Sequence, residues 1–506
     1  MMVKSNNKVK KFGVILSTID DLVSEEHIVR KYQAAIDWDF IYDIVEPLYS
    51  KVGAPSIDPV VLFKMVMLNY LEGIHSMRKT CRLIEDNISY RWFLGLDIYD
   101  KVPDHSTYSK NMERKFIDHP EIYDEIFNKI IKEAYNEGFI NPDNIFGDAT
   151  HVKANANKKK HKAKVIKQIT KTYKEDIIND INKDREEHNK KPIKNDEDDS
   201  DKFNGKEIKD SDELLKNEDS EEIIDSECDE KGKVISYDCV DVETGEIHKR
   251  AVSKGYKRIK ESTTDKDSGF YHKGEHEKVF AYAASAACDN NGFIVALHVD
   301  KGNLHDSVTF FELNKEINKL EFSNKIKNIV LDAGYKTPAI CREIIKEGKQ
   351  ALMPYTRPKT KKEYFKKYEF TYDEYYDNVI CPNNETLEYS TTTKEGYKQY
   401  KSDPKKCISC PYKRKCTNSK NSVKVYTRHI WQNYLDETDE HRYEEESKKI
   451  YARRKETIER CFGEGKENNG LRFTRYRGIK RVSSSLRLLF ACQNLRKLAR
   501  WKWKLA

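Results

Sequence analysis

The sequence predicts an α/β protein with a mixed-sheet core, an all-helical N-terminal domain and a small Cys-rich β insertion. Three observations support this prediction. Residues 25–120 follow helical periodicity, strand-like and helical segments alternate from about residue 277, and the Tyr-rich, strand-like stretch 366–428 contains a cluster of cysteines. At 506 residues the chain is long enough for roughly two to four domains.

The N-terminal region carries signals for several short helices. Ser56 or Asp58 can cap a helix that ends at Gly73, and further helices are predicted from Ser76 and from near Ser106. Short helices joined by tight turns, with arginines among them, are typical of a helix-turn-helix DNA-binding domain. A helical bundle without DNA contacts has the same pattern, so both interpretations stay open.

The order of the segments after residue 144 predicts the topology of the sheet. A strand ending at Asp148 comes first, and strand, strand, helix, strand, helix and strand follow. The predicted ranges of these six segments are 278–289, 292–303, 306–321, 326–335, 337–348 and 350–357. An RNase H-like sheet has this order and requires one later helix, for which residues 447–466 are the candidate.

Two aspartates end strands that are neighbours in such a sheet. Asp148 comes late in the first strand and Asp332 ends the fourth, so both are expected at carboxyl ends of adjacent strands. Carboxylates that close together repel each other unless a cation lies between them, and Mg²⁺ prefers oxygen ligands. Two such ions about 3.5–4 Å apart can support phosphodiester cleavage. Taken singly, each aspartate also fits a turn or a cap.

The later helix offers a third acid surrounded by cations. Glu459 sits beside the apolar stripe of Ile458 and Phe462, and Lys466 lies two turns further along the same face. The basic residues 453–455 closely precede it. A glutamate that faces metal beside cations that hold phosphates suits nucleic-acid chemistry, whereas an exposed ion pair is the alternative.

Charge is distributed unevenly along the chain. The net charge is +7, but residues 196–230 hold 17 acidic residues against 4 lysines, so the rest of the chain carries +20. Residues 453–506 contain 16 Lys and Arg and only 4 Glu. Such a field suits a polyanion, most simply nucleic acid, and a solvated basic tail is the alternative. Residues 158–232 begin with lysines and continue into the acidic run, which predicts a partly helical, partly disordered insert.

Four of the eleven cysteines form a cluster. Cys381 precedes Cys407, Cys410 and Cys416, and a C-x-x-C pair with two further cysteines can form a tetrahedral thiolate Zn²⁺ site. The surrounding segment is too small to fold well without a cross-link such as a bound metal ion. Reduced, unliganded cysteines are the alternative, and the other seven are expected to be small core residues.

The composition does not favour a membrane protein. No apolar run approaches the roughly 18 residues of a membrane span, and the six-residue run "FGVILS" is too short for a signal-peptide core. We therefore expect a cytoplasmic, nucleoid-associated protein with reduced cysteines.

These segments resemble, nearly end to end, the DDE transposases of bacterial insertion sequences, specifically the group named for insertion sequence "eleven-eighty-two". The helical stretch from "SIDPVVLFKMVMLNYL" to "PDHSTYSKNMERKF" is similar to their N-terminal domain. "GDATHVKANANK", "VLDAGYKT" and "RRKETIERCFGEGKENNGLRFTRYRG" look like their two Asp segments and their Glu segment. The resemblance implies a catalytic, metal-binding triad of Asp148, Asp332 and Glu459, with Lys466 as the accompanying base.

The sequence departs from the family at one motif. Related transposases often carry Tyr, two residues, Arg, three residues, Glu, six residues and Lys. Here Tyr451 and Arg454 keep the first spacing, but four residues separate Arg454 from Glu459. The arginine position therefore falls on Arg454 or Lys455. The stretches "STTDKDSGFYHKG" and "KGNLHDS" also resemble family segments, without a chemical role that the residues indicate.

The sequence thus predicts a transposase that binds element ends and uses two Mg²⁺ (or Mn²⁺) ions for DNA cleavage and strand transfer. We expect a homodimer on double-stranded DNA. The alternatives are a catalytically silent DNA-binding protein derived from a transposase, and a metal-dependent nuclease without strand transfer. The predicted DNA contacts are Arg78, Arg82, Arg454, Lys455, Arg460 and Lys466.

Six ranges divide the chain in this prediction. They are a helical DNA-binding domain (1–130), the first core strand (131–157), a charged insert (158–265), the remaining core strands (266–360), the Cys-rich insertion with its possible zinc site (361–430), and the core helix with the basic C-terminal helix (431–506).

Overall fold

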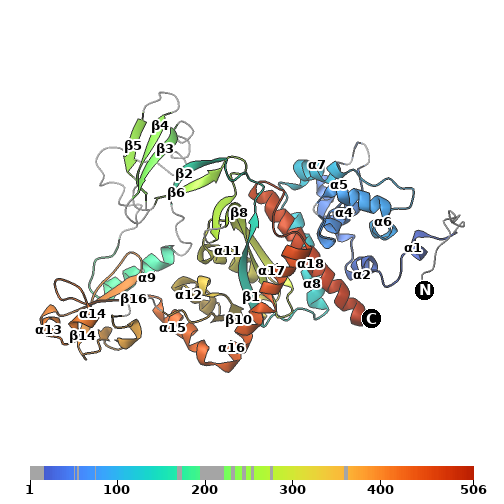
Figure 1. Ribbon diagram of the computed structural model, residues 1–506. Coiled ribbons are helices and arrows are strands. Elements are labelled where there is room, and N and C mark those ends of the chain that lie inside the picture. Colours follow the sequence, from blue (N-terminus) through green and yellow to red (C-terminus); the bar gives the residue numbers. More distant parts are fainter. Residues whose placement is uncertain are drawn as a thin grey trace, which may run out of the picture. The chain divides into compact units, whose positions relative to one another are not determined.

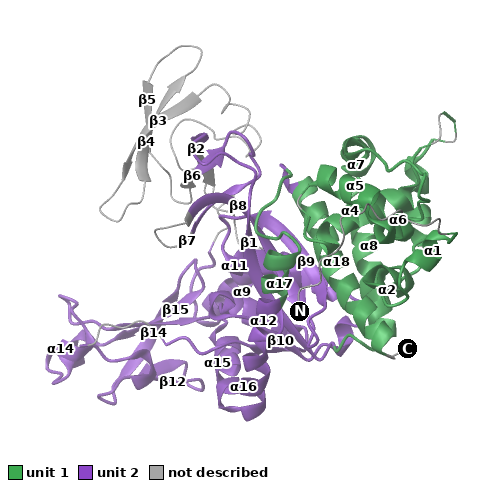
Figure 2. Ribbon diagram, turned by 45° about the vertical axis from the view of Figure 1, so that its right-hand side comes forward, with its two compact units in different colours: residues 1–141, 461–476, 480–506 green, residues 142–460, 477–479 purple. Residues whose placement is uncertain are grey.

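The computed structural model describes residues 16–50, 52–53, 56–74, 76–167, 174–193, 221–228, 234–241, 247–251, 256–273, 277–357 and 363–505. The chain divides into two compact units, coloured separately in Figure 2. The first unit comprises residues 1–141, 461–476 and 480–506, and the second comprises residues 142–460 and 477–479. Segments from the two ends of the sequence therefore build one unit.

The first unit is helical throughout its described residues, which confirms the predicted N-terminal helical region. Asp58 caps α4, and its Oδ1 accepts a hydrogen bond from the amide of Val60 at 2.7 Å. Ser76 caps α5 as predicted. The helices of this unit before residue 141 are α1 (Ile19–Leu22), α2 (Ile28–Ala35), α3 (Phe40–Val45), α4 (Pro59–Leu71), α5 (Met77–Asp86), α6 (Ile88–Leu94), α7 (His105–Asn111) and α8 (Glu121–Asn136).

The basic C-terminal region is part of this helical unit. Helix α18 (Ile479–Leu505) contacts α4 through Ser485 Oγ and the Tyr70 hydroxyl, 2.9 Å apart, and contacts α8 through Lys502 Nζ and Glu133 Oε1, also 2.9 Å apart. A solvated tail is therefore the wrong interpretation of this segment, because its apolar residues are packed in the core. The buried residues of α18 include Val482, Leu486, Leu488, Leu489, Phe490, Ala491, Cys492, Leu495 and Leu498.

The second unit is built on an eight-stranded mixed sheet. Its order is β11-β10-β1-β8-β7-β6-β2, with β9 also paired to β8. Strand β10 is parallel to β1 and β11 is parallel to β10, whereas the other pairs are antiparallel. The strands are β1 (Asn144–Lys153), β2 (His161–Lys167), β6 (Tyr256–Ser262), β7 (Gly269–Lys273), β8 (Glu277–Cys288), β9 (Ile294–Lys301), β10 (Asn328–Val330) and β11 (Gln350–Leu352).

The five strands β9-β8-β1-β10-β11 have the predicted RNase H-like order. Figure 1 labels β8, β1 and β10 of this sheet. Strand β8 is central, and its residues 281–288 are all buried and mostly alanine, which lets covering elements approach closely. Helix α11 (Asp306–Asn318) packs on β8 and β9, and α12 (Pro338–Lys346) packs on β11. The mixed-sheet core is therefore confirmed, and β2, β6 and β7 extend it in a way that the sequence did not indicate.

Elements also form within the predicted charged insert. Helix α9 (Lys174–Glu187) follows β2, and a separate three-stranded sheet contains β3 (Glu221–Cys228), β4 (Val234–Asp241) and β5 (Ile247–Ala251). Apart from β3, the acidic run over 196–230 lies outside the described residues.

The Cys-rich β insertion is confirmed as a five-stranded antiparallel sheet. Its strands pair in chain order: β12 (Thr371–Asp373), β13 (Asn378–Ile380), β14 (Thr386–Thr392), β15 (Tyr397–Ser402) and β16 (Val425–His429). The short helices α13 (Pro404–Ile408) and α14 (Lys413–Cys416) lie between β15 and β16, and α15 (Gln432–Glu440) follows.

The predicted single helix over 447–466 is wrong. The chain forms α16 (Glu445–Ala452), a 3₁₀ turn (453–455) and α17 (Ile458–Asn468). Arg453 donates from Nη1 to the side-chain oxygen of buried Asn290 at 3.1 Å and from Nη2 to its carbonyl at 2.9 Å. These bonds anchor the 3₁₀ turn to the β8–β9 connection. In a continuous helix the side chain of Arg453 would point in a different direction.

No helix within the described ranges is long and apolar enough to cross a bilayer.

Candidate active site

The pairing register brings Asp148 and Asp332 to the same edge of the sheet. Strands β1 and β10 pair in parallel, and the last pair is Phe146 with Val330. Each aspartate lies two residues beyond that pair, so both stand where the parallel pairing ends, and open α/β sheets place their chemistry at such ends. Asp332 follows β10, but β1 continues past Asp148 to Lys153, so the predicted strand end at Asp148 is wrong. The predicted juxtaposition of the two acids is therefore what this register produces.

Glycine 147 permits this close approach. A Cβ added to Gly147 would lie 2.7 Å from Cδ2 of Leu331, which directly precedes Asp332. A larger residue at this position would push the end of β1 away from the end of β10.

A third aspartate, Asp306, lies beside Asp332. The Gly334 amide donates to Asp332 Oδ1 at 2.7 Å. A Cβ added to Gly334 would lie 3.1 Å from that same oxygen and 3.7 Å from Asp306 Oδ2, so both carboxylates face one glycine. The sequence interpretation missed Asp306 because an acid at the start of a helix is usually read as a cap. In the structure the cap of α11 is His305, whose Nδ1 accepts from the Ser307 amide at 3.2 Å.

Arg454 is the basic residue that contacts these acids. Its Nη2 lies 2.9 Å from Asp148 Oδ2, and its guanidinium carbon lies 5.8 Å from the centre of the Tyr451 ring. Arg454 is buried, whereas Lys455 is exposed. Of the two residues predicted for the arginine position, Arg454 is therefore the one that contacts the acids, and its role stays a prediction. A phosphate contact by Arg454 would require its ion pair with Asp148 to open.

The acids carry more negative charge than Arg454 neutralises. Burial raises the pKa of Asp148 to about 6, Arg454 opposes this rise, and Asp332 and Asp306 add to it. Burial also raises the pKa of Asp306, and Asp332 contributes to that rise. An electrostatic arrangement of this kind is typical of functional sites.

Two polar groups beside the acids have no hydrogen-bond partner among the described residues. They are the hydroxyl of Tyr335, which is fully buried, and Nε of Arg454. Burial raises the pKa of Tyr335 well above its usual range, and Asp306, Asp148 and Asp332 add to that rise. A buried polar group without a partner calls for an explanation such as an ion or water. Neither group was identified from the sequence.

The residues present fit a divalent cation. Oxygen donors with surplus negative charge are the ligands that Mg²⁺ and Mn²⁺ take, and Asp148, Asp332 and Asp306 supply them. Within the described ranges, no group of three or more His, Cys, Asp or Glu side chains is already spaced to hold an ion. The three carboxylates therefore lie near one another but are not yet spaced as the ligands of one ion.

The structure leaves the role of Glu459 a prediction. Glu459 is exposed in the first turn of α17 and belongs to the same unit as the aspartates. Arg460 is exposed next to it, and Lys466 lies two turns further along α17 and belongs to the first unit. Their predicted contacts with DNA likewise stay predictions.

Arg78 and Arg82 lie one turn apart on α5, and both are exposed. Nε of Arg78 lies 2.9 Å from Nε2 of His105 at the start of α7. By contrast, Arg91 donates to the backbone carbonyls of Asp97 and Asp100, which is a structural role. An exposed basic face of this kind is compatible with a DNA contact.

The four clustered cysteines line one cavity in the Cys-rich sheet, far along the chain from the aspartates. The cavity is also lined by Lys406, Lys413 and Lys424.

A mixed sheet in this order, with two aspartates where the parallel pairing of β1 and β10 ends, is consistent with an RNase H-like fold of the DDE type. Two family models match the chain: one described as a transposase domain (DUF772) matches residues 17–114, and one described as a transposase DDE domain matches residues 380–499. Both matches support an insertion-sequence DDE transposase. The comparison with curated proteins and the comparison with solved structures give no match. The group within the family stays a prediction.

The matched ranges cover α1 to α7, the Cys-rich sheet from β13 onward, α17 and most of α18. They do not include Asp148 or Asp332, so the assignment of these two residues rests on the register of β1 and β10.

Proposed function

We propose that this transposase binds the ends of its element, cleaves DNA there and joins the freed end to target DNA. The observation that carries the proposal is the pairing register of β1 and β10, which sets Asp148 and Asp332 side by side. The aspartate cluster carries surplus negative charge, and the chain as a whole is basic. This combination suits a site that takes a cation and then a polyanion.

In this proposal Asp148, Asp332 and Asp306 hold divalent metal, and Glu459 joins them when DNA is bound. A bound Mg²⁺ or Mn²⁺ would lower the pKa of a water nucleophile and stabilise charge on the leaving oxygen. Arg454 keeps Asp148 ionised and oriented through the ion pair at 2.9 Å. The unpartnered Tyr335 hydroxyl provides a donor beside the acids.

DNA binding is assigned in the proposal to α5 and to the basic residues near Glu459. Arg78 and Arg82 point from one face of α5, which places two cations at a spacing that phosphates can engage. Lys466 and Arg460 would contact the scissile strand, and a homodimer would hold two element ends together.

A cleavage assay with a duplex that ends in the element's terminal repeat tests the proposal. With Mg²⁺, Asp332→Asn should cut at least about 100-fold more slowly than the unaltered protein, because a metal ligand is lost. Its affinity for the same duplex in a gel-shift assay should be unchanged.

The matched control is Asp143→Asn at the opposite end of β1, where the carboxylate is 47% exposed and pairs with Lys327 at 3.2 Å. This variant should cleave normally. Equal cleavage by Asp332→Asn and the control would refute the assignment of Asp332. Cleavage without any joined product would identify the nuclease alternative, and binding without cleavage by the unaltered protein would identify the silent DNA-binding alternative.

A further inference from the structure

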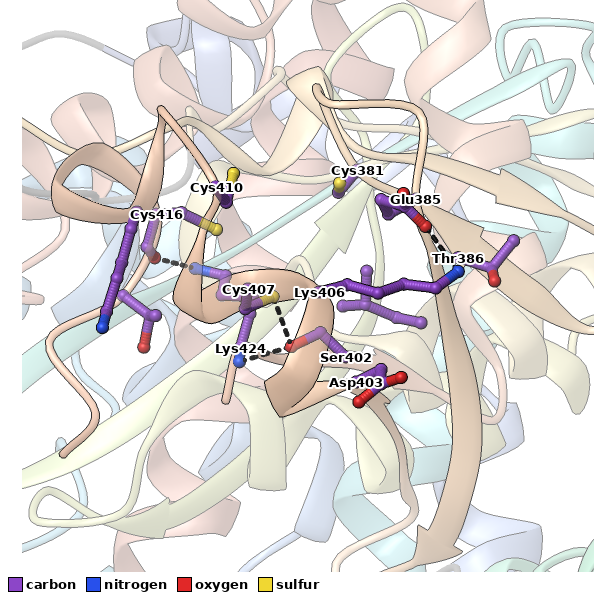
Figure 3. Close-up of a pocket in the computed structure, with 13 residues that line it drawn as sticks. Cys381, Glu385, Thr386, Ser402, Asp403, Lys406, Cys407, Cys410, Cys416 and Lys424 are labelled. Atoms are coloured by element: carbon purple, nitrogen blue, oxygen red, sulfur yellow. Dashed lines mark hydrogen bonds and ion pairs between the residues drawn. The ribbon is translucent and has the colours of Figure 1, made fainter. Parts of the chain in front are cut away.

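We propose that the Cys-rich sheet binds one structural Zn²⁺ ion through four thiolates. The ligands are Cys381, Cys407, Cys410 and Cys416. All four line a single cavity of about 30 Å³. Figure 3 shows Cys381 on the side of the β13–β14 hairpin and the other three on the side of α13 and α14. The site belongs to a different sheet from Asp148 and Asp332, so it does not depend on the proposed function.

The hairpin holds Cys381 in a tight turn that orients its sulfur. The Asn384 amide donates to the Cys381 carbonyl at 2.9 Å, and Asn384 adopts a left-handed φ of 57°. This tight turn directs the Asn383 amide to Cys381 Sγ at 3.4 Å. Hydrogen bonds of this kind orient the ligands of a metal site.

The helical side supplies three sulfurs from two short turns. Cys407 lies in the last turn of α13, and the Cys410 amide donates to the Cys407 carbonyl at 3.4 Å, which closes the C-x-x-C turn. Cys416 ends α14, and its carbonyl accepts from Lys424 Nζ at 3.0 Å.

Binding requires deprotonation and a rearrangement of the side chains, because within the described part of the chain these thiols are not yet spaced as ligands. Four S–H protons pass to solvent, four Zn–S bonds form, and the resulting centre carries a net charge of about −2. Lys413 and Lys424 line the same cavity and offset this charge, whereas Lys406 is paired with Glu385 at 2.7 Å.

The sheet needs such a cross-link because its own core is small. The fully buried apolar cluster consists of Phe370, Val379, Leu387 and Tyr400, and Cys381 and Cys416 pack against it. Helices α13 and α14 contribute no buried residue at all within their described positions. A core of this size rarely supports an independent fold, and a structural metal is a common remedy. The ion would fasten α13 and α14 to the β13–β14 hairpin.

Metal analysis of the full chain, purified in reducing buffer without chelators, tests the proposal. The unaltered protein should carry about one zinc per chain, and the double substitution Cys407→Ser, Cys410→Ser should lower this to less than about a tenth. Cys81→Ser, in α5, is the matched control and should keep its zinc. Replacing zinc by Co²⁺ should give the visible and near-ultraviolet absorption of tetrahedral cobalt thiolate.

Three outcomes would overturn the proposal. One is unaltered protein that contains no zinc and gives no cobalt–thiolate absorption. Another is full zinc in the double variant, and the third is a disulfide between any two of the four cysteines under reducing purification. If the double variant fails to fold, the cobalt spectrum of the unaltered protein decides the question. Asp332→Asn should retain zinc whether or not it cleaves DNA, which separates this proposal from the proposed function.

Discussion

Replacing Arg454 by alanine should destabilise β1 around Asp148 in a pH-dependent manner. Asp148 is largely buried, with 23% of its side chain exposed, and Arg454 is the cation that pairs with it. Removing the guanidinium leaves a buried carboxylate beside Asp332 and Asp306. The pKa of Asp148, already raised to about 6, should then rise further.

The size of the effect follows from that pKa. The difference between about 6 in the folded protein and the ordinary 3.8 means that ionised Asp148 already costs about 3 kcal/mol of stability above pH 6. Because the folded pKa is the higher one, this cost disappears as the pH falls from about 6 toward 3.8. Breaking a buried ion pair typically adds about 3–5 kcal/mol. We therefore expect Arg454→Ala to lose roughly that much at pH 8 and at least about 1.4 kcal/mol less at pH 5.

Hydrogen–deuterium exchange of peptides from β1 measures this loss locally. At pH 8, with chelator present, a loss of about 3 kcal/mol corresponds to exchange that is more than about 100-fold faster after correction for intrinsic rates. Lys455→Ala, the exposed neighbour, is the control and should leave exchange unchanged. Added Mg²⁺ should restore protection in Arg454→Ala, since a cation replaces the lost charge. A loss of equal size at pH 5 and pH 8 would show that packing, and not charge, explains the role of Arg454.

Three other predictions concern cleavage and DNA binding. Asp306→Asn should slow cleavage by about 10-fold or more in limiting Mg²⁺ and less in saturating Mg²⁺, since it removes one oxygen ligand; a loss independent of Mg²⁺ concentration would contradict this. Cleavage at limiting Mg²⁺ should fall about tenfold per pH unit below about pH 6, because protonated Asp148 cannot hold metal, and a profile flat down to pH 5 would exclude Asp148 as a ligand. Arg82→Ala should weaken binding of element ends and lower the slope of log affinity against log salt by about 1, whereas an unchanged slope would remove α5 from the interface.

The sequence was sufficient for the sheet because local patterns and strand order constrain its topology strongly. The apolar residues before Asp148 and Asp332 predicted a strand in front of each aspartate. Parallel pairing of the first and fourth strands followed from the order of elements. The five-stranded Cys-rich sheet was likewise visible as alternating Tyr-rich segments between cysteines.

Other features depend on contacts between residues distant in sequence, which a local pattern does not contain. The proposed role of Asp306 depends on its proximity to Asp332 in the folded chain. In the sequence alone, Asp306 resembles any acid at the start of a helix. The break between α16 and α17 depends on Arg453 binding Asn290, which lies 163 residues earlier. A solvated basic tail stayed open as an alternative for the C-terminal region, because the acids that pair with its basic residues, such as Glu133, lie in helices at the other end of the chain.

A metal-specificity switch at Asp332 tests the central claim most directly. Asp332→Cys should be inactive in cleavage with Mg²⁺, which binds sulfur poorly, and should regain activity with Mn²⁺, which accepts it better. Asp143→Cys at the other end of β1 should cleave with both ions. Restoration by Mn²⁺ in the Asp332 variant alone would establish that this carboxylate holds the catalytic ion. Full activity of Asp332→Cys in Mg²⁺ would contradict the claim that Asp148 and Asp332 form the metal-binding centre.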